Sequence, residues 1–532
     1  MQNASSSSAS DLTAAGIARM RFHIHQMWER LTRSPRHIRA ALTDPKWAAP
    51  SGGPPPLYIG PRERPERIRK RLEKSLSEEA LAGLDIRVVP HEHTEITDHG
   101  LLFLPGRYVV PGGRFNELYA WDSYFIVLGL LREGRAGLAA SMADQMLYSV
   151  QHYGTVPTAN RTYYLTRSQP PLLGRIVMAV YESTGDLDWL KSAAPLVEKY
   201  CYYWCVAPHD VPAAGLARYH GLGKGPCAEV VSSERDENGF THYDRLAAEL
   251  MRHGDDPAMA RYLDPATNAL TDEAFIGDRA LRESGFDISA RFGPAGVEAA
   301  YHLPVCLNTL LWRMERDMAR IFETLDRPNA AANWIERASA RAAAIHDTLW
   351  DDGQGIFLDH HMLKNERTPY PFATAFWPMW AGLAHSDQAR RMVEKWLPLF
   401  EAPGGLHTSL QPSGCQWDFP MTWAPLVLFA VKGLHRYGYV EEGRRIARRF
   451  LTMVHAEFHR TGHLFEKYDV LTQSSVVEHH IHFGYNENQT GFGWTNACVL
   501  ELLYHLGALG HSVPPAFANA DGDASSGPSA AL

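Results

Sequence analysis

From Tyr119 onward, one helix-forming segment follows another along the chain. Apolar residues recur in them every three or four positions, the spacing that gives a helix an apolar face. The segments come in pairs joined by short loops, and every second connection is long and polar. This alternation predicts a closed ring of helical hairpins, in which inner helices surround a central pit and long loops roof one end. The predicted helices cover Trp121–Glu133, Gly137–His152, Pro170–Ser183, Asp186–Cys205, Tyr301–Thr324, Ala330–Leu349, Thr374–Ala384, Ser386–Leu399, Pro420–Tyr437, Val440–His459 and Thr495–Leu509.

Local signals support several of these helices. Pro170 and Pro171 favour a helix start, and Asp186 and Ser386 are candidate N-caps. No short repeat period is visible, so an α-solenoid is less favoured than a closed ring.

The chain before Tyr119 has a different character. A helical segment near Ala15–Thr32 precedes a Pro- and Gly-rich connector, and between residues 86 and 110 short apolar stretches alternate with polar turns, which predicts a few short strands. The predicted divisions are a disordered N-terminus (1–14), a helical extension (15–84), a main domain (85–508) and a disordered tail (513–532).

Composition excludes several classes of partner. The net charge of -8 lacks the basic footprint of a nucleic-acid binder, which leaves a neutral or weakly charged ligand. No run approaches the roughly 18 apolar residues of a membrane span, and Met1–Leu12 lacks the features of a secretory signal. The six cysteines form no C-x-x-C pair, which suits a reducing compartment. We therefore expect a cytoplasmic protein without nucleic-acid or membrane partners, a monomer or weak homo-oligomer.

Residues 111–125 combine a glycine turn, an arginine, two carboxylates and several aromatic rings at the entrance of a predicted helix. Carbohydrate sites use such a mixture, because sugar hydroxyls need polar partners and the C–H faces of the ring pack on aromatic side chains. A capped helix start with satisfied polar groups explains this stretch equally well.

Further long loops are rich in similar residues: Asn160–Pro171, Glu283–Phe292, Gln416–Pro420, Leu464–Asp469 and Gly491–Asn496. Hydrolysis of a glycosidic bond needs one carboxyl group that stays protonated and one that stays ionised. Asp287 lies between Phe286 and Ile288, which would desolvate an acid, and Glu466 precedes Lys467, which favours a charged carboxylate. By composition alone each is more simply an ordinary loop carboxylate, one of 60 acidic residues.

Other chemistries have weaker support. The glycine-rich run at residues 221–225 lacks the spacing of a phosphate-binding loop, and no G-x-S-x-G elbow is present. The segment Glu478–His482 would bring metal ligands together if it were helical, but it is not H-E-x-x-H, and we interpret it as a loop. We therefore predict no metal ion at this segment.

Taken together, these loops resemble the trehalase family, glycoside hydrolase family 37. One family signature, P-G-G-R-F-x-E-x-Y-x-W-D-x-Y, matches Pro111–Tyr124, and the other, Q-W-D-x-P-x-x-W-x-P, matches Gln416–Pro425. The stretches N-R-T-Y-Y-L-x-R-S-Q-P-P, E-S-G-aromatic-D, E-K-Y-D and G-F-G-W-T-N follow in the family's order. The resemblance spans about residues 85–508. It implies an (α/α)6 toroidal catalytic domain with long active-site loops, which cleaves α,α-trehalose to two glucose molecules with inversion and without metal or cofactor.

The resemblance also implies residue roles. Asp287 matches the general acid and Glu466 the general base. The positions implied to bind the disaccharide are Arg114, Phe115, Trp121, Asp122, Thr158, Arg167, Ser168, Gln169, Glu229, Gly285, Trp417 and Asp418.

Three positions depart from the family pattern. Thr158 stands in place of an asparagine, Cys227 in place of an arginine, and Tyr485 in place of a sugar-binding glutamate, for which Glu487 would substitute if the loop shifted by two residues. The family's glycine-rich lid is replaced by Val476–Asn488. These departures leave two alternatives open: hydrolysis of another small α-glucoside or glycosyl conjugate by the same catalytic pair, and an inactive sugar-binding protein on the same scaffold.

Overall fold

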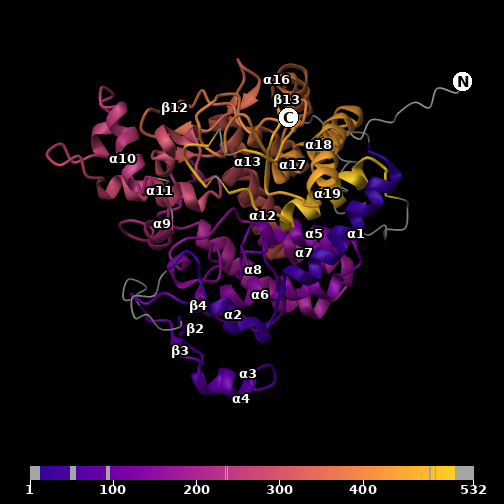
Figure 1. Cartoon of the computed structure of the whole chain (residues 1–532). Coiled ribbons are helices and arrows are strands. Elements are labelled where there is room, and N and C mark those ends of the chain that lie inside the picture. Colours follow the sequence, from indigo (N-terminus) through magenta and orange to yellow (C-terminus); the bar gives the residue numbers. More distant parts are fainter. Residues whose placement is uncertain are drawn as a thin grey trace, which may run out of the picture.

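The computed structural model describes residues 12–47, 55–91, 96–233, 235, 238–477, 481–485 and 487–509. The tail predicted to be disordered, most of the N-terminus predicted to be disordered, and residues 478–480 of the histidine-rich segment lie outside these ranges. Helices dominate the described chain, and its strands form small sheets of two or three (Figure 1). The prediction of a mostly helical chain with a minor extended component is confirmed.

Six helices of the described residues pack side by side in a closed inner ring. Helix α5 consists mainly of apolar residues and is buried from Asp122 to Leu131, and α19 is buried from Gly493 to Leu503. A helix that is buried on all sides needs neighbours on both flanks and behind it, which a double ring provides. In ring order the inner helices are α5 (Asp122–Arg132), α7 (Leu173–Thr184), α12 (Val305–Thr324), α14 (Trp377–Ala381), α17 (Ala424–Arg436) and α19 (Gly493–His505), which packs back on α5.

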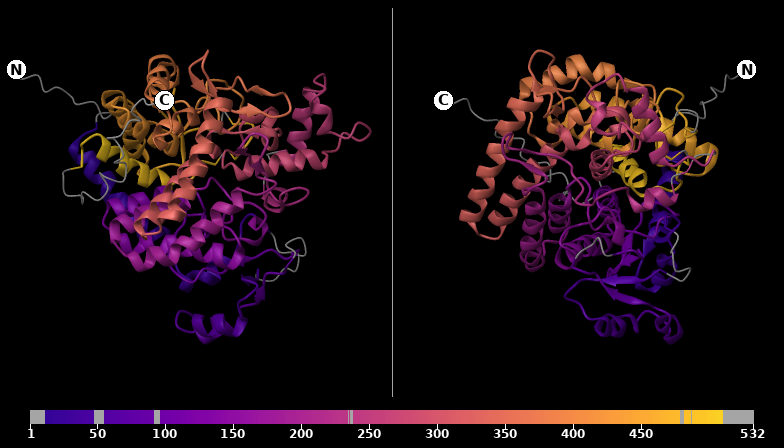
Figure 2. Two further views of the ribbon diagram at one scale, coloured as in Figure 1. Left: turned by 180° about the vertical axis from the view of Figure 1, so that it is seen from behind. Right: turned by 90° about the vertical axis from the view of Figure 1, so that its left-hand side faces the viewer.

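The outer helices cover this ring. They are α6 (Ala136–Tyr153), α8 (Leu187–Trp204), α13 (Pro328–Leu349), the run of α15 (Ser386–Arg391), a π-helical turn (Met392–Trp396) and α16 (Leu397–Phe400), then α18 (Val440–Thr461) and α1 (Ala14–Leu31). Helix α1 packs against α18 and α19 through Ile24 and Trp28, among other buried residues. It therefore completes the outer layer, although it lies in the predicted N-terminal extension (Figure 2). The domain boundary at residue 85 stays a prediction.

Helices α5 and α19 approach each other closely at Gly129. A Cβ atom at Gly129 would lie 2.7 Å from Cβ of Ala497 and 2.8 Å from its Cα atom, so a larger residue would push the helices apart. Above this contact, the backbone N–H of Gly493 donates to the carbonyl of Pro111 at 2.6 Å. The loops that lead into the two helices are thus joined at the place where the ring closes.

The chain between α8 and α12 forms α9 (Ala228–Ser233), α10 (His242–Arg252) and α11 (Asp272–Glu283), which were not among the predicted helices. A capping box marks the start of α10, because Asp244 N–H donates to Thr241 Oγ1 at 3.1 Å and Thr241 N–H donates to Asp244 Oδ2 at 2.8 Å. In Figure 1, α10 and α11 lie at one side of the molecule, beside the loops that roof the ring.

Short strands join segments that are distant in sequence. Strand β2 (Leu57–Ile59) lies parallel between β3 (Ile86–Val88) and β4 (Leu101–Leu102), with α3 (Pro65–Leu72) and α4 (Glu78–Ala82) in the crossover, and β1 (Thr32–Arg33) pairs antiparallel with β5 (Tyr108–Val109). Besides short 3-10 turns, the described chain contains α2 (Ile38–Leu42) and five further small sheets. In one of them β11 (His360–His361) lies between β8 (His302–Leu303) and β12 (Glu366–Arg367). The other four are the pairs β6 (Asp210–Val211) with β7 (Leu216–Ala217), β9 (Trp350–Asp351) with β10 (Ile356–Phe357), β13 (Glu401–Ala402) with β14 (Gly405–Leu406), and β15 (Met421–Trp423) with β16 (Lys467–Asp469).

Several predicted helix starts were too early. Helix α7 begins at Leu173 and not at Pro170, and α14 begins at Trp377 and not at Thr374. In two other cases strand pairing takes the residues in front of the helix. Helix α12 begins at Val305, after β8, and α17 begins at Ala424, after β15. Strand β15 pairs with β16 so that Trp423 lies opposite Lys467. His385, rather than Ser386, is the N-cap of α15.

A buried arginine ties the segment around α2 to the ring. Arg161 is 0% exposed and donates to the carbonyl oxygens of Ala41 and Leu42 at 2.6 and 3.1 Å. Its Nε also donates to Glu117 Oε1 at 2.7 Å. Oδ2 of Asp44 lies 3.5 Å from the same Nε. Replacing Arg161 would therefore leave a buried carboxylate without its closest cation.

We expect Arg161→Leu to lower the free energy of unfolding by about 3–5 kcal/mol, because it leaves Glu117 charged and buried. The midpoint of thermal unfolding, followed by circular dichroism, measures this. The control is Arg36→Leu, which changes an exposed arginine in the same part of the chain and should leave the midpoint unchanged. Equal midpoints for the two variants would contradict the role given to Arg161.

Candidate active site

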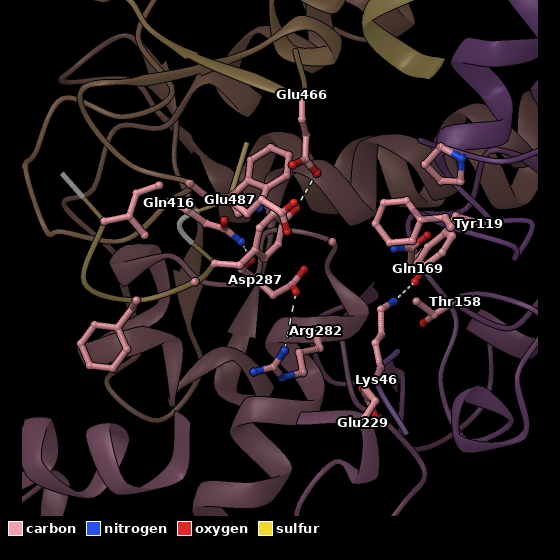
Figure 3. A pocket seen from close by; sticks show the side chains of 18 of the residues that line it. Lys46, Tyr119, Thr158, Gln169, Glu229, Arg282, Asp287, Gln416, Glu466 and Glu487 are labelled. Atoms are coloured by element: carbon pink, nitrogen blue, oxygen red, sulfur yellow. Dashed lines mark hydrogen bonds and ion pairs between the residues drawn. The ribbon is translucent and has the colours of Figure 1, made fainter. Parts of the chain in front are cut away.

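A cavity of about 1190 Å³ opens at the loop end of the ring. Its volume slightly exceeds the usual range of small-ligand pockets, about 300–1,000 Å³, so it has room for a disaccharide. Most residues predicted from the sequence to form the site line it together: Arg114, Phe115, Trp121, Asp122, Thr158, Arg167, Gln169, Glu229, Gly285, Asp287, Trp417 and Glu466. Figure 3 shows Thr158, Gln169, Glu229, Asp287 and Glu466 around the cavity.

The aromatic part of the wall is a cluster of packed rings. Trp121 lies edge-on to Trp494 and Phe286, with ring centroids 5.5 and 5.6 Å apart, and Trp417 stacks on Trp423 at 3.7 Å. Trp121, Trp417 and Trp494 reach the cavity. Because their neighbours fix these rings, the cavity offers rigid apolar surfaces of the kind that pack against the C–H face of a sugar.

Asp287 lies on the loop that follows α11, and its side chain points into the cavity. Its chain neighbours Phe286 and Ile288 are buried, whereas the Asp287 side chain is 34% exposed, so they do not desolvate it as expected. Nη1 of Arg282 lies 3.7 Å from Oδ2 of Asp287. The amide of Gln416 donates to the carbonyl of Asp287 at 2.5 Å, which fixes the backbone.

Glu466 directly precedes β16, lines the cavity and is only 2% exposed. Its Oε1 accepts a hydrogen bond from the hydroxyl of Tyr485. Its Oε2 is also buried and has no hydrogen-bond partner among the described residues. A buried carboxylate oxygen without a partner is costly, so this atom is a ready acceptor for a water molecule or a ligand hydroxyl.

Burial raises the pKa of Glu466, although the charge of Lys467, the hydroxyl of Tyr485 and the charge of Arg114 act in the opposite direction. The charge of Lys467 lowers the pKa of Glu466, as expected from the sequence. Burial raises the pKa by more than Lys467 lowers it. Lys467 itself donates to Gln416 Oε1 at 2.7 Å and to the carbonyl of Tyr485 at 2.9 Å. Burial lowers the pKa of Lys467 to about 8.

A third carboxylate shares the cavity. Asp122 is the first residue of α5 and is 4% exposed. Burial, then the charge of Glu466 and, more weakly, that of Asp287, raises the pKa of Asp122 well above its usual value. Two carboxylates in one dry site cannot both be charged cheaply, so this arrangement favours at least one protonated carboxyl group near neutral pH.

The side of the cavity formed by the NRTYY loop and α9 is polar. Arg167 donates to the thiol of Cys227 at 2.9 Å and also to Glu229. Burial alone would raise the pKa of Glu229, but the charges of Arg167 and Arg282 lower it. Thr158 donates to the carbonyl of Ser168 at 2.7 Å. The thiol that stands at the family's arginine position therefore contacts Arg167 and supplies no cation.

Ser168 and Asp418, which the sequence also assigned to the site, do not line the cavity. Asp418 is fully buried and accepts hydrogen bonds from Ser289 Oγ at 2.7 Å and from Ala290 N–H at 2.8 Å. Ser168 is also fully buried, and its N–H donates to Glu283 at 3.1 Å. Both residues fasten the loops that carry the cavity-facing residues.

Sequence reasoning missed several lining residues. Among them are Lys46, Tyr119, Tyr164, Arg235, Arg245, Arg252, Arg282 and Phe492. Tyr119 and Phe492 lie inside the family motifs and were within reach of motif reading. Lys46 has no sequence signal, because it comes from the segment before the ring.

Tyr485, one of the departures, and Glu487, its possible substitute, both line the cavity. Tyr485 contacts Glu466, and Glu487 forms an ion pair with Arg114 at 3.0 Å. The Glu487 side chain is 70% exposed, so it lies at the mouth of the cavity.

Neither a metal centre nor a membrane helix is found in the described part of the chain. No group of histidine, cysteine and acidic residues is arranged there to hold a metal ion, and residues 478–480 of the histidine-rich segment lie outside it. No helix among the described residues has the length and apolar character needed to cross a bilayer.

A family model described as Trehalase matches residues 19–507. The chain belongs to the trehalase family. It is 34% identical to the cytosolic neutral trehalase of Saccharomyces cerevisiae over 557 residues, covering 92% of this chain and 72% of the relative. It is also 34% identical to the cytosolic neutral trehalase of Emericella nidulans, covering 91% and 72%.

Solved structures agree with this membership. The neutral trehalase Nth1 from Saccharomyces cerevisiae superimposes with a TM-score of 0.77 at 31% identity, covering 95% of this chain and 96% of that one. A mannosylglycerate hydrolase from Thermus thermophilus shares the fold alone, with a TM-score of 0.50 at 18% identity over 74% of this chain and 95% of that one. The (α/α)6 toroid implied by the trehalase resemblance is confirmed.

We expect Gly285→Ala to lower the midpoint of thermal unfolding and to change the tryptophan fluorescence. Gly285 has φ +75°, which is strained for alanine, and a Cβ atom there would lie 3.1 Å from Cε2 of Trp121. The control is Gly113→Ala, because a Cβ atom at Gly113 has no neighbour within 4 Å. A Gly285 variant with wild-type fluorescence and midpoint would refute this account of the wall.

Proposed function

We propose that this protein hydrolyses α,α-trehalose to two glucose molecules, with Asp287 as general acid and Glu466 as general base. The observation that carries the proposal is the buried, unpartnered Oε2 of Glu466 in the same cavity as Asp287. Membership of the trehalase family over residues 19–507 supports the reaction. The names of the cytosolic relatives support a cytoplasmic location. A monomer or weak homo-oligomer stays our expectation.

In this proposal Asp287 gives its proton to the glycosidic oxygen as the bond to the leaving glucose breaks. Oε2 of Glu466 accepts a proton from a water molecule, which attacks the anomeric carbon from the opposite face. The product from the attacked unit therefore has inverted configuration. Tyr485 occupies Oε1 of Glu466, so Oε2 is the oxygen left for the water.

The electrostatics of the cavity suit the role of Glu466. A general base works best when its pKa lies near the working pH, and burial moves the pKa of Glu466 upward in that direction. Arg282 lies beside the other carboxyl group, with Nη1 3.7 Å from Oδ2 of Asp287. The 34% exposed side chain of Asp287 is accessible to a glycosidic oxygen.

The charge of the lining supports a neutral substrate. Side chains of both signs line the cavity: the bases Lys46, Arg114, Arg167, Arg235, Arg245, Arg252 and Arg282, and the acids Asp122, Glu229, Glu249, Asp287, Glu466 and Glu487. Such a wall offers charged donors and acceptors to hydroxyl groups without selecting for a charged ligand.

We expect the purified protein to release glucose from trehalose, with α-glucose and β-glucose appearing initially in equal amounts because one unit is inverted. Proton NMR of the anomeric signals, recorded before mutarotation is complete, measures this. Kojibiose, maltose and glucosylglycerate are tested alongside. Cleavage of another of these substrates but not of trehalose would contradict the proposed substrate, and two α-glucose products would contradict inversion.

The acid and base are tested with isosteric variants. Asp287→Asn and Glu466→Gln should each lower kcat by at least about 10²-fold, the lower end of a general acid–base contribution, while circular dichroism stays unchanged. The control is Asp256→Asn, which changes an exposed carboxylate outside the cavity. If either cavity variant keeps a near-normal rate, its assigned role is wrong.

We expect Tyr485→Phe to move the acidic limb of the profile of kcat/KM against pH to higher pH. The Tyr485 hydroxyl favours the ionised form of Glu466, so its removal raises the pKa of Glu466 further. The base is active when ionised, and activity is lost as the pH falls through that raised pKa. Tyr202→Phe, which changes an exposed tyrosine, is the control. A limb at unchanged or lower pH would exclude this role for Tyr485.

A further inference from the structure

A lysine from outside the family motifs reaches the cavity. Lys46 lies in the segment between α2 and the first residue of the family signature, yet it lines the cavity beside Tyr119 and Thr158 (Figure 3). Its Nζ donates to the hydroxyl of Tyr119 and lies 5.0 Å from the ring centroids of both Phe115 and Tyr119. The ammonium group therefore sits against the aromatic side of the sugar-binding wall.

The backbone around Lys46 is fixed from several sides. The N–H of Lys46 donates to Asp44 Oδ1 at 2.9 Å, which closes a tight turn, and Asp44 Oδ2 accepts from the hydroxyl of Tyr163 at 2.7 Å. Arg161 binds the carbonyl oxygens of Ala41, Leu42 and Thr43 just before this turn. A long, flexible side chain on such a rigid base loses less freedom when it binds a ligand.

The ammonium group is partly buried and has no close counter-charge. Among the described residues, no carboxylate oxygen lies within 4.0 Å of Nζ. The nearby acid Glu117 is already paired with Arg161. Burial lowers the pKa of Lys46, and the charges of Glu117, Asp44 and Glu229 only partly oppose this. Burying a charge in this way is costly unless another partner is present for part of the time.

The geometry indicates what that partner is. An ammonium group has three donors, and Tyr119 takes one of them. Lys46 interacts electrostatically with Glu229 and with Asp122, which both line the cavity. A group placed between them must accept a hydrogen bond from a cation and donate one to a carboxyl group. A sugar hydroxyl does both, whereas a phosphate or carboxylate would be repelled by Glu229.

We propose that Lys46 is a substrate-binding residue that donates a hydrogen bond to a hydroxyl group of the disaccharide beside Glu229. This rests on the proposed function, since it names a further group that holds the same substrate. The segment before the ring is then a working part of the active site.

The test compares Lys46→Met and Lys46→Ala with wild type in trehalose hydrolysis. Lys46→Met keeps the aliphatic stem over Phe115 and removes only the charged donors, so kcat/KM should fall by about ten- to a hundredfold, the size of one charged hydrogen bond. The matched control is Lys70→Met, an exposed lysine on α3. Added ethylammonium should restore part of the activity of Lys46→Ala, whereas tetramethylammonium, which has no donor, should not.

Each outcome decides the proposal. Values of kcat/KM for Lys46→Met within about twofold of wild type would overturn it. A loss in Lys46→Ala that ethylammonium does not relieve, together with a lower midpoint of thermal unfolding, would assign Lys46 a structural role and also overturn it. Turnover of trehalose by the wild-type protein tests the proposed function. The ratio of kcat/KM between the Lys46 variants and wild type tests the role of Lys46, so a failure of one proposal is distinguishable from a failure of the other.

Discussion

The close packing of α5 against α19 at Gly129 is the constraint on which the rest of the structure depends. Because these helices close the inner ring, Trp121, just before α5, and Trp494, in the first turn of α19, meet at the same rim. The hydrogen bond from the N–H of Gly493 to the carbonyl of Pro111 fixes the position of the start of α19 relative to the loop before α5. If only loops joined these helices, the aromatic rings of the wall could shift relative to one another. Because the rings are carried by packed helices, the wall is rigid, and that rigidity suits the binding of a small polar ligand.

The charged groups of the cavity influence one another's pKa values. Arg167 and Glu229 neutralise each other, Lys467 and Tyr485 both act on Glu466, and Asp122 responds to two acids across the cavity. In such a dry site the protonation of one group changes the pKa of the next. The departures from the family pattern fall within this network, because Cys227 touches Arg167 and Tyr485 touches Glu466. The chain has therefore kept the carboxylates and changed the groups that tune them.

The sequence predicted the ring and much of the cavity, for identifiable reasons. Helix periodicity is a local property, so the paired helices could be read directly, and the motifs predicted twelve residues that do line one cavity, including Asp287 and Glu466. Helix starts were misplaced where β8 and β15 pair with distant strands, which no local pattern reveals. Ser168 and Asp418 are buried behind the wall because a motif does not say which of its polar residues faces inward. Lys46 was missed because the position of its segment depends on hydrogen bonds from Arg161. The hydrogen bond to the carbonyl of Leu42 joins residues that are 119 positions apart in the sequence. The desolvation of Glu466 was missed too, because burial is a property of the assembled loops.

Helix α1 gives the ring an unusual order of assembly. Among the described residues, the outer helix that covers α19 is the first long helix, while α19 is the last. During synthesis α1 leaves the ribosome with its apolar face, including Ile24 and Trp28, lacking its permanent partner until almost the whole chain has been made. The ring therefore cannot close in stages from one end. A nascent chain interrupted before α19 lacks the α5–α19 contact and the Trp494 side of the cavity, so the cavity forms only once α19 has been made.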